Sequence, residues 1–253
     1  MCYRAASGNA ETGTEYFCGQ AGLRFAGNER KHFVPTEAAR QNLLREGKDT
    51  SCIYVTGNTA IDALKRIIDH EYKNVYLQWA KDSRLILITA QRRENLGRPL
   101  EQIFSAVRRV VDEFSDLKVI YPMHKNPKVR QIAEQIFGKH QRIRLIEPLD
   151  VTDFHNFMAR AYLILTDSSG IQEEAPFFNR PVLVIRDTTE RMEGIAAGTL
   201  RLAGTGEAPV YRELKRLLVD QDAYQKMSQS LNPYGDGTAG KKIADILEQI
   251  LGT

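Results

Sequence analysis

The sequence predicts an α/β protein built on a doubly wound, Rossmann-like parallel sheet. Short aliphatic runs recur from residue 53 to residue 204, and several are apolar along their whole length. Continuous apolarity is typical of strands that are covered on both faces. Longer segments of helical period separate these runs, and this alternation favours a parallel sheet with helices on both sides. Such sheets bind ligands at the carboxyl ends of their strands.

Each predicted strand is a run rich in Ile, Leu, Val or Tyr. In chain order the runs are 53–57, 84–89, 117–122, 142–148, 162–167, 180–186 and 199–204, and we expect them in one sheet. Between them, residues 99–115 carry apolar side chains at i, i+3, i+4 and i+7, which predicts an amphipathic helix.

The two ends of the chain depart from this alternation. Residues 1 to about 30 are rich in Gly, Ala and Thr and show no clear strand or helix. The tail reads NPYGDG at 232–237, where Pro and Gly predict turns, and a final helix follows it.

Composition limits the class of protein. The chain has 253 residues, of which 42% are hydrophobic and 26% charged, enough for one large domain or two small ones. Its net charge of +3 is spread along the chain, which does not suggest a nucleic-acid-binding face. We find neither the long apolar run of a membrane span nor the apolar core of a signal peptide. The three cysteines are scattered and odd in number, so we expect a reducing cytoplasm and no disulfide framework.

Polar residues follow the predicted strand at 162–167, in the string LTDSSGIQEEAP. A Ser or Asp at this boundary can cap the next helix, and free N–H groups there favour an anion such as a diphosphate. Glu174 lies about one turn further on and is a suitable acceptor for paired ribose hydroxyls. The alternative is an ordinary capping box whose acids complement the helix dipole.

Other strand ends carry similar chemistry. His124 follows the run 117–122 beside Lys125, where it could face a phosphate or be merely structural. Arg92 and Arg93 follow the run 84–89; they could contact phosphate or pair with a nearby glutamate.

The loop at 186–194 offers Glu190 or Arg191 to a ligand, although single loop charges are usually solvated. Because all these strand ends should lie on one edge of one sheet, together they favour a nucleotide site.

Several stretches of the sequence indicate a particular protein family more specifically than the chemistry of their residues does. They are VTGNTAIDAL, LITAQRRENLG, VIYPMHKNP, DSSGIQEEAP, PVLVIRDTTERMEG and NPYGDG, in that order. From about Gly22 to its end the chain resembles the non-hydrolysing bacterial UDP-N-acetylglucosamine 2-epimerases.

The resemblance implies a fold and an activity. It implies two Rossmann-like domains in the GT-B arrangement, of which this chain would carry the C-terminal, UDP-binding half. Such enzymes interconvert UDP-GlcNAc and UDP-ManNAc in the cytoplasm, for cell-envelope polysaccharides, by elimination and re-addition of UDP. They need no nicotinamide or other cofactor and no metal. The implied partners are UDP-GlcNAc, UDP and, as a homodimer, a second copy of the chain.

The resemblance also assigns roles to residues. Ser168, Ser169 and Gly170 would hold the diphosphate, and Glu174 would accept from the ribose. Phe154 would border the uracil. The phosphate and sugar side would be lined by Arg191 and by His124, the candidate catalytic residue, which could stabilise the departing UDP.

Departures from the family pattern are equally informative. Ser169 stands where the family usually has glycine, Gln91 where it has histidine and Leu149 where a polar residue is common. Gln20 replaces a glutamate of the family's His-Val-Glu-Ala-Gly-Leu-Arg string and cannot act as a general base.

Most of the family's first domain finds no counterpart. We therefore expect a remnant of that domain at 1–48, a UDP-binding domain at 49–232, and a linker and crossover helix at 233–253. The expected function is that of a truncated 2-epimerase with impaired activity. A UDP-sugar-binding pseudoenzyme is the alternative, and a GT-B glycosyltransferase is a more distant one.

Overall fold

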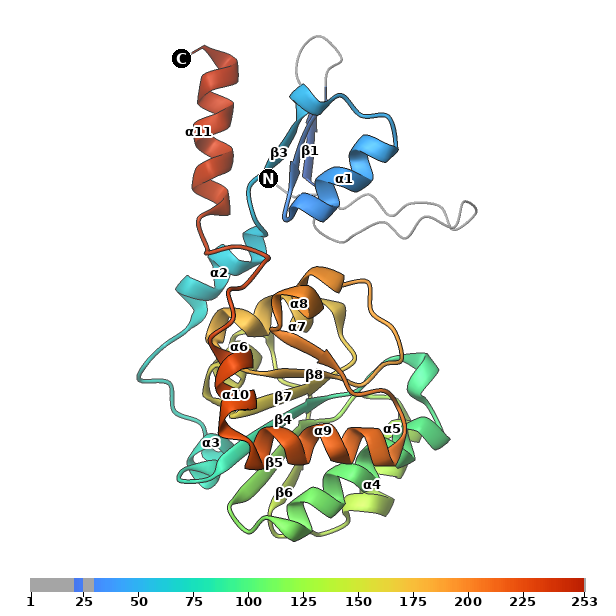
Figure 1. Cartoon of the computed structure of the whole chain (residues 1–253). Coiled ribbons are helices and arrows are strands. Elements are labelled where there is room, and N and C mark those ends of the chain that lie inside the picture. The colour runs from blue at the N-terminus through green and yellow to red at the C-terminus, as the bar shows by residue number, and fades with distance from the viewer. Residues whose placement is uncertain (1–20, 25–29, 253) are drawn as a thin grey trace. The chain divides into compact units, whose positions relative to one another are not determined.

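The computed structural model describes residues 21–24 and 30–252, which belong to two compact units (Figure 1). Unit 1 comprises residues 1–66 and 233–253, and unit 2 comprises residues 67–232. The chain therefore first passes from unit 1 to unit 2 after Arg66. The sequence suggested a domain boundary between residues 48 and 49.

Unit 2 is built on a six-stranded parallel sheet in the order β6-β5-β4-β7-β8-β9. The strands are β4 (Arg84–Thr89), β5 (Leu117–Pro122), β6 (Ile143–Ile146), β7 (Leu163–Thr166), β8 (Val182–Val184) and β9 (Leu200–Leu202). All six lie within predicted runs, so the prediction of a doubly wound parallel sheet is confirmed. The strand order reverses between β4 and β7, whose last residues, Thr89 and Thr166, are paired.

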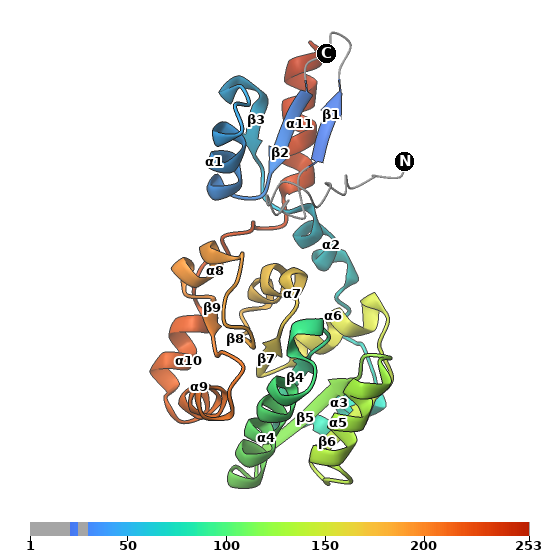
Figure 2. The same cartoon turned by 90° about the vertical axis from the view of Figure 1, so that its right-hand side faces the viewer.

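Helices cover both faces of this sheet (Figure 2). One face packs on α4 (Arg98–Glu113), α5 (Pro127–Phe137), α9 (Glu207–Val219) and α10 (Gln221–Ser228). The other packs mainly on α3 (Val75–Ala80) and α6 (Val151–Arg160), beside the short α7 (Ser169–Glu174) and α8 (Met192–Ala197). Ile86 and Ile88 face the first layer while Leu85 and Leu87 face the second, which explains why β4 is apolar throughout.

Unit 1 holds a three-stranded sheet in the order β1-β2-β3. β1 (Ala21–Arg24) runs antiparallel to β2 (Arg30–Val34), which runs parallel to β3 (Ile53–Val55). The strand predicted at 53–57 therefore exists but does not join the larger sheet. β1 was not predicted, because four residues of low β propensity give no periodic signal.

The tail of the chain also belongs to unit 1. Here α1 (Glu37–Arg45) and α2 (Thr59–Ile67) are accompanied by the predicted last helix, α11 (Ala239–Leu251). Asp62 of α2 accepts hydrogen bonds from the amides of Ala239 (3.0 Å) and Gly240 (2.6 Å), so one carboxylate satisfies two amides in the first turn of α11.

A close backbone approach explains the glycine of the NPYG turn. A Cβ at Gly235 would stand 3.3 Å from the Cα of Gly57, and both glycines have a positive φ. The neighbouring Asn58 donates its amide to the carbonyl of Tyr234 at 2.7 Å. No helix among the described residues is long and apolar enough to cross a bilayer.

Candidate functional site

A hollow of about 390 Å³ lies where the carboxyl ends of β4, β5 and β6 meet α6 and α7. Its lining consists of Thr89, Ala90, Gln91, Pro122, Met123, His124, Lys125, Pro148, Leu149, Phe154 and Ile171. The volume suits a small-molecule ligand, and the position is the edge at which doubly wound sheets bind.

The lining has a polar side and an apolar side. His124 and Lys125 are exposed, and the His124 Nδ1 accepts from the amide of Asn126 at 3.2 Å. The neutral ring therefore carries its proton on Nε2. Leu149 and Phe154 are partly buried against the core beneath the sheet. This arrangement can receive a ligand with one flat apolar part and one anionic part.

A buried carboxylate fixes the loop that follows β4. Asp167, which follows β7, accepts from the amides of Gln91 (3.0 Å) and Arg92 (2.9 Å) and from Nδ2 of Asn95 (3.0 Å). Burial raises the pKa of the Asp167 carboxyl, although these hydrogen bonds act in the opposite direction. Sequence reasoning gave Asp167 no separate role, although an acid directly after a buried strand was visible.

The side chains of Ser168 and Ser169 have different surroundings. Ser168 is the residue before α7, but its hydroxyl makes no capping hydrogen bond, and its amide donates to Thr166 Oγ1 at 3.0 Å. The Ser169 hydroxyl accepts from Arg92 Nη2 at 2.6 Å and donates to Glu190. Ser169 therefore joins the loops that follow β4, β7 and β8.

Arg92 and Glu190 belong to a compact cluster of charges. Arg92 Nη2 lies 3.4 Å from Glu190, and Arg186 approaches Glu190 at 2.7 Å and Glu94 at 3.3 Å. Burial alone would raise the pKa of Glu190, but bonds from Ser169 and Arg186 outweigh it and lower the pKa to about 2. Glu190 is therefore ionised at neutral pH. Arg93, the other arginine predicted here, is exposed.

The remaining predicted residues lie on or beside α7, outside the lining of the hollow. Arg191 and Glu173 form an ion pair, and both are almost completely buried. Glu174 is partly exposed, and its Oε2 lies 3.0 Å from Nε2 of His155. The structure thus brings His124 and Phe154 into one hollow, and Ser169 into a neighbouring cluster. Sequence reasoning missed His155, which directly follows Phe154.

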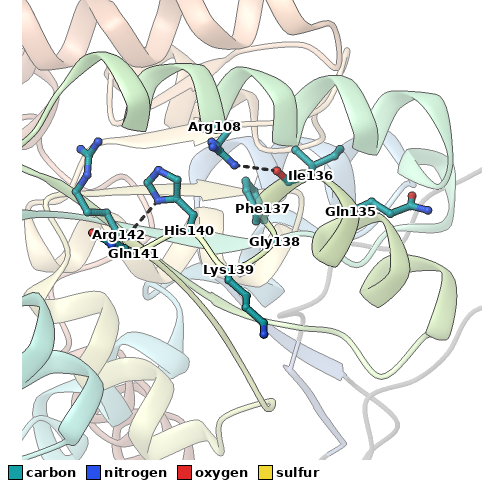
Figure 3. Close-up of a pocket in the computed structure, with 9 residues that line it drawn as sticks. All are labelled: Arg108, Gln135, Ile136, Phe137, Gly138, Lys139, His140, Gln141 and Arg142. Atoms are coloured by element: carbon teal, nitrogen blue, oxygen red, sulfur yellow. Dashed lines mark hydrogen bonds between the residues drawn. The ribbon is translucent and has the colours of Figure 1, made fainter.

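A second hollow, of about 500 Å³, is less suited to a ligand (Figure 3). It lies near the amino ends of the strands, and Arg108 and residues 135–142 line it. Arg108 already donates to Asp112 (2.9 Å) and to the carbonyl of Ile136 (3.3 Å), and Arg142 donates to a carbonyl as well. The two arginines of this hollow therefore already have hydrogen-bond partners within the protein. The hollow also lies at the amino edge of the sheet, whereas doubly wound sheets bind ligands at the carboxyl edge.

The described residues contain no group of three or more His, Cys, Asp or Glu side chains arranged to hold a metal ion. Besides paired carboxylates, the carboxyl edge presents hydroxyls, cations and apolar walls. This donor set suits an organic phosphate.

Comparison with known proteins gives a consistent result. A sequence model described as UDP-N-acetylglucosamine 2-epimerase matches residues 30–248. The UDP-N-acetylglucosamine 2-epimerase of Bacillus subtilis is 55% identical over 216 residues, which cover 85% of this chain and 57% of that protein. The Escherichia coli K12 enzyme is 45% identical over 226 residues, covering 86% and 60%.

Solved structures agree. The S. aureus MnaA–UDP co-structure superposes with a TM-score of 0.85 at 55% identity, covering 88% of this chain and 61% of that one. UDP-GlcNAc 2-epimerase from Neisseria meningitidis, bound to UDP-GlcNAc, gives 0.79 at 36% identity, covering 87% and 61%. This chain therefore spans about three fifths of the length of the relatives it matches.

The charge cluster predicts a specific dependence of stability on pH. The pKa of Glu190 falls from 4.5 to about 2 on folding, so its contribution is complete above about pH 5 and is lost as pH falls toward 2. Between those values we expect the unfolding free energy of the wild type to fall more steeply than that of Glu190→Gln. Urea denaturation at a series of pH values measures both slopes.

Glu94→Gln is the matched control. The Glu94 side chain is 55% exposed, against 18% for Glu190, so this variant should follow the wild-type slope. Equal slopes for the wild type and Glu190→Gln would contradict the prediction.

Proposed function

The chain belongs to the UDP-N-acetylglucosamine 2-epimerase family, and from this we propose that unit 2 binds the UDP part of a UDP-N-acetylhexosamine. One observation carries the proposal: an apolar hollow, a hydroxyl-rich turn and a histidine-paired carboxylate lie around the switch point of one sheet. Base, diphosphate and ribose require these three kinds of group. Relatives co-crystallised with UDP and UDP-GlcNAc support the same ligand class.

The uracil is assigned to the apolar side of the hollow. Phe154 and Leu149 offer flat apolar surface there, close to Pro148. The Leu149 side chain has no hydrogen-bonding group, so recognition of the polar edge of the base falls to other groups.

The diphosphate is assigned to the turn that contains Ser168, Ser169 and Gly170. The Ser168 hydroxyl makes no capping bond that a ligand would have to break. On the polar side of the hollow, His124 can donate from Nε2 to an oxygen of the departing UDP. Arg191 keeps its proposed place on the phosphate and sugar side, and its pairing with Glu173 ties it to α7.

The ribose is assigned to Glu174. His155 donates from Nε2 to one carboxylate oxygen of Glu174, and no other described residue bonds to this carboxylate. The second oxygen therefore retains its full capacity to accept from ribose hydroxyls. His155 orients the carboxylate without adding a permanent cation.

Replacing Glu174 tests the ribose assignment. We expect Glu174→Ala to weaken UDP binding about tenfold, because a charged hydrogen-bond acceptor is lost. Isothermal titration with UDP measures the change. With 2′,3′-dideoxy-UDP, which lacks the hydroxyls, the wild type and the variant should bind equally. If the variant lost as much affinity for the dideoxy compound as for UDP, the assignment would be wrong.

The proposed reaction is the interconversion of UDP-GlcNAc and UDP-ManNAc by elimination and re-addition of UDP. It needs groups that move a proton at C2 of the sugar. Gln20 stands where the family resemblance places a glutamate, and an amide cannot serve as a general base. We therefore propose that this chain retains nucleotide binding while its epimerase activity is impaired.

An assay of the purified chain separates the candidate functions. With UDP-GlcNAc we expect UDP binding but conversion to UDP-ManNAc far below that of the Bacillus subtilis relative run in parallel. Binding without any conversion would favour a UDP-sugar-binding module. Conversion at the rate of that relative would contradict impaired activity, and transfer of labelled GlcNAc to an acceptor would indicate a glycosyltransferase.

We propose a cytoplasmic location and a small-molecule ligand for this chain. The three cysteines are odd in number and scattered, which supports a reducing, cytoplasmic location. The dispersed charge supports small-molecule ligands rather than nucleic acid or a membrane surface.

Self-association is proposed through α11. Among its described side chains only Ala239 is buried, while Ile250 and Leu251 are 37% and 60% exposed. Ile246 and Leu247 lie on the same apolar stripe. We expect a dimer that Ile246→Asp converts to monomer, as measured by size-exclusion chromatography with light scattering. Gln249→Asp adds the same charge on the polar side of the helix, away from this stripe, and should leave the dimer intact. A monomeric wild type would contradict the proposal.

A further inference from the structure

The carboxylate of Glu190 already occupies the groups that the proposed diphosphate would use. Its Oε1 accepts from the Ser169 hydroxyl and lies 3.4 Å from Arg92 Nη2. The same Arg92 nitrogen donates to Ser169 Oγ at 2.6 Å. One carboxylate oxygen thus sits between a hydroxyl and a guanidinium, as a phosphate oxygen would.

Ser169 makes this contact possible. Where the family pattern has glycine at this position there is no hydroxyl, so a glycine could not bridge Arg92 to Glu190. The contact joins the turn after β7 to the loop that follows β8, twenty-one residues further along the chain.

The Glu190 carboxylate can leave Ser169 without losing all of its ion-pair partners. Arg186 holds the other oxygen of Glu190, Oε2, at 2.7 Å and is itself almost buried. If Oε1 turned away from Ser169, the charge of Glu190 would remain paired with Arg186. The low pKa of Glu190 keeps it ionised, so a diphosphate arriving beside it meets a negative charge.

We propose that Glu190 is an internal competitor of the diphosphate: a nucleotide binds fully only when its phosphate displaces the carboxylate from Ser169 and Arg92. The inference rests on the proposed function, because it takes the turn at 168–170 as the diphosphate site. The competition lowers the affinity for UDP and acts only on ligands that carry phosphate. Ser169 has a different partner in each state: its hydroxyl holds Glu190 in the free protein and contacts the diphosphate once the carboxylate has been displaced.

Titration of the full chain tests the competition. Glu190→Gln keeps the shape of the side chain and one acceptor oxygen but removes its charge. Removing a like charge beside the ligand should tighten binding of UDP and of inorganic diphosphate about tenfold. Binding of uridine, which carries no phosphate, should not change. Glu94→Gln removes a charge from the same cluster but has no bond to Ser169, and it should change UDP affinity less than about twofold.

The outcomes separate this inference from the proposed function. If Glu190→Gln leaves diphosphate and UDP affinity unchanged or weaker, the competition does not exist. If Glu190→Gln gains affinity for diphosphate while neither protein binds UDP, the competition stands and the proposed function fails. If neither protein binds any of the ligands, both ideas are wrong.

A crystal structure of the wild type with UDP gives a second test that needs no variant. We expect the diphosphate to contact Ser169 and Arg92, and the Glu190 carboxylate to have turned onto Arg186. Bound UDP together with an intact Ser169–Glu190 hydrogen bond would overturn the inference.

Discussion

The buried carboxylate of Asp167 is the interaction on which the rest of the site depends. It follows β7, yet its hydrogen-bond donors, the amides of Gln91 and Arg92 and the side chain of Asn95, follow β4. β4 and β7 are neighbours only because the strand order reverses there. Burying an ionised carboxylate is costly unless its lone pairs are satisfied, so these donors fix the loop after β4 in one conformation.

Fixing that loop has consequences for the charges around it. One of the two backbone amides that donate to Asp167 belongs to Arg92, and the Arg92 side chain donates in turn to the carbonyl of Asp167 at 2.9 Å. The guanidinium is thereby held where it meets Ser169 and Glu190. A short chain of contacts thus leads from the buried end of β7 to the surface at which a ligand would bind. These contacts can form because β4 and β7 are neighbours in the sheet.

Sequence patterns predicted the parts of this structure that local physics determines. β4 and β5 were predicted to the residue, because a strand covered on both faces must be apolar throughout. The start of α2 follows the same local physics, because Asn58 precedes the helix and its Oδ1 accepts from the amide of Ala60 at 2.9 Å. The pairs His155–Glu174 and Ser169–Glu190 join residues that are distant in sequence, so no local pattern could reveal them. The roles given to all the site residues stay predictions: His124, Phe154, Ser168, Ser169, Gly170, Glu174 and Arg191.

The carboxylates at this edge differ in the hydrogen bonds that they can still accept, and this difference supports the proposed ribose acceptor. Asp167 is saturated by amides, Glu173 is paired with Arg191, and Glu94 and Glu190 are paired with arginines. Glu174 alone among these has a histidine as its partner, bonded through one oxygen. A carboxylate facing a guanidinium would have to give up a charged contact to take a neutral hydroxyl, whereas Glu174 gives up nothing. The choice of Glu174 for the ribose, made from its spacing after the turn, therefore has an independent basis in the pairing of its neighbours.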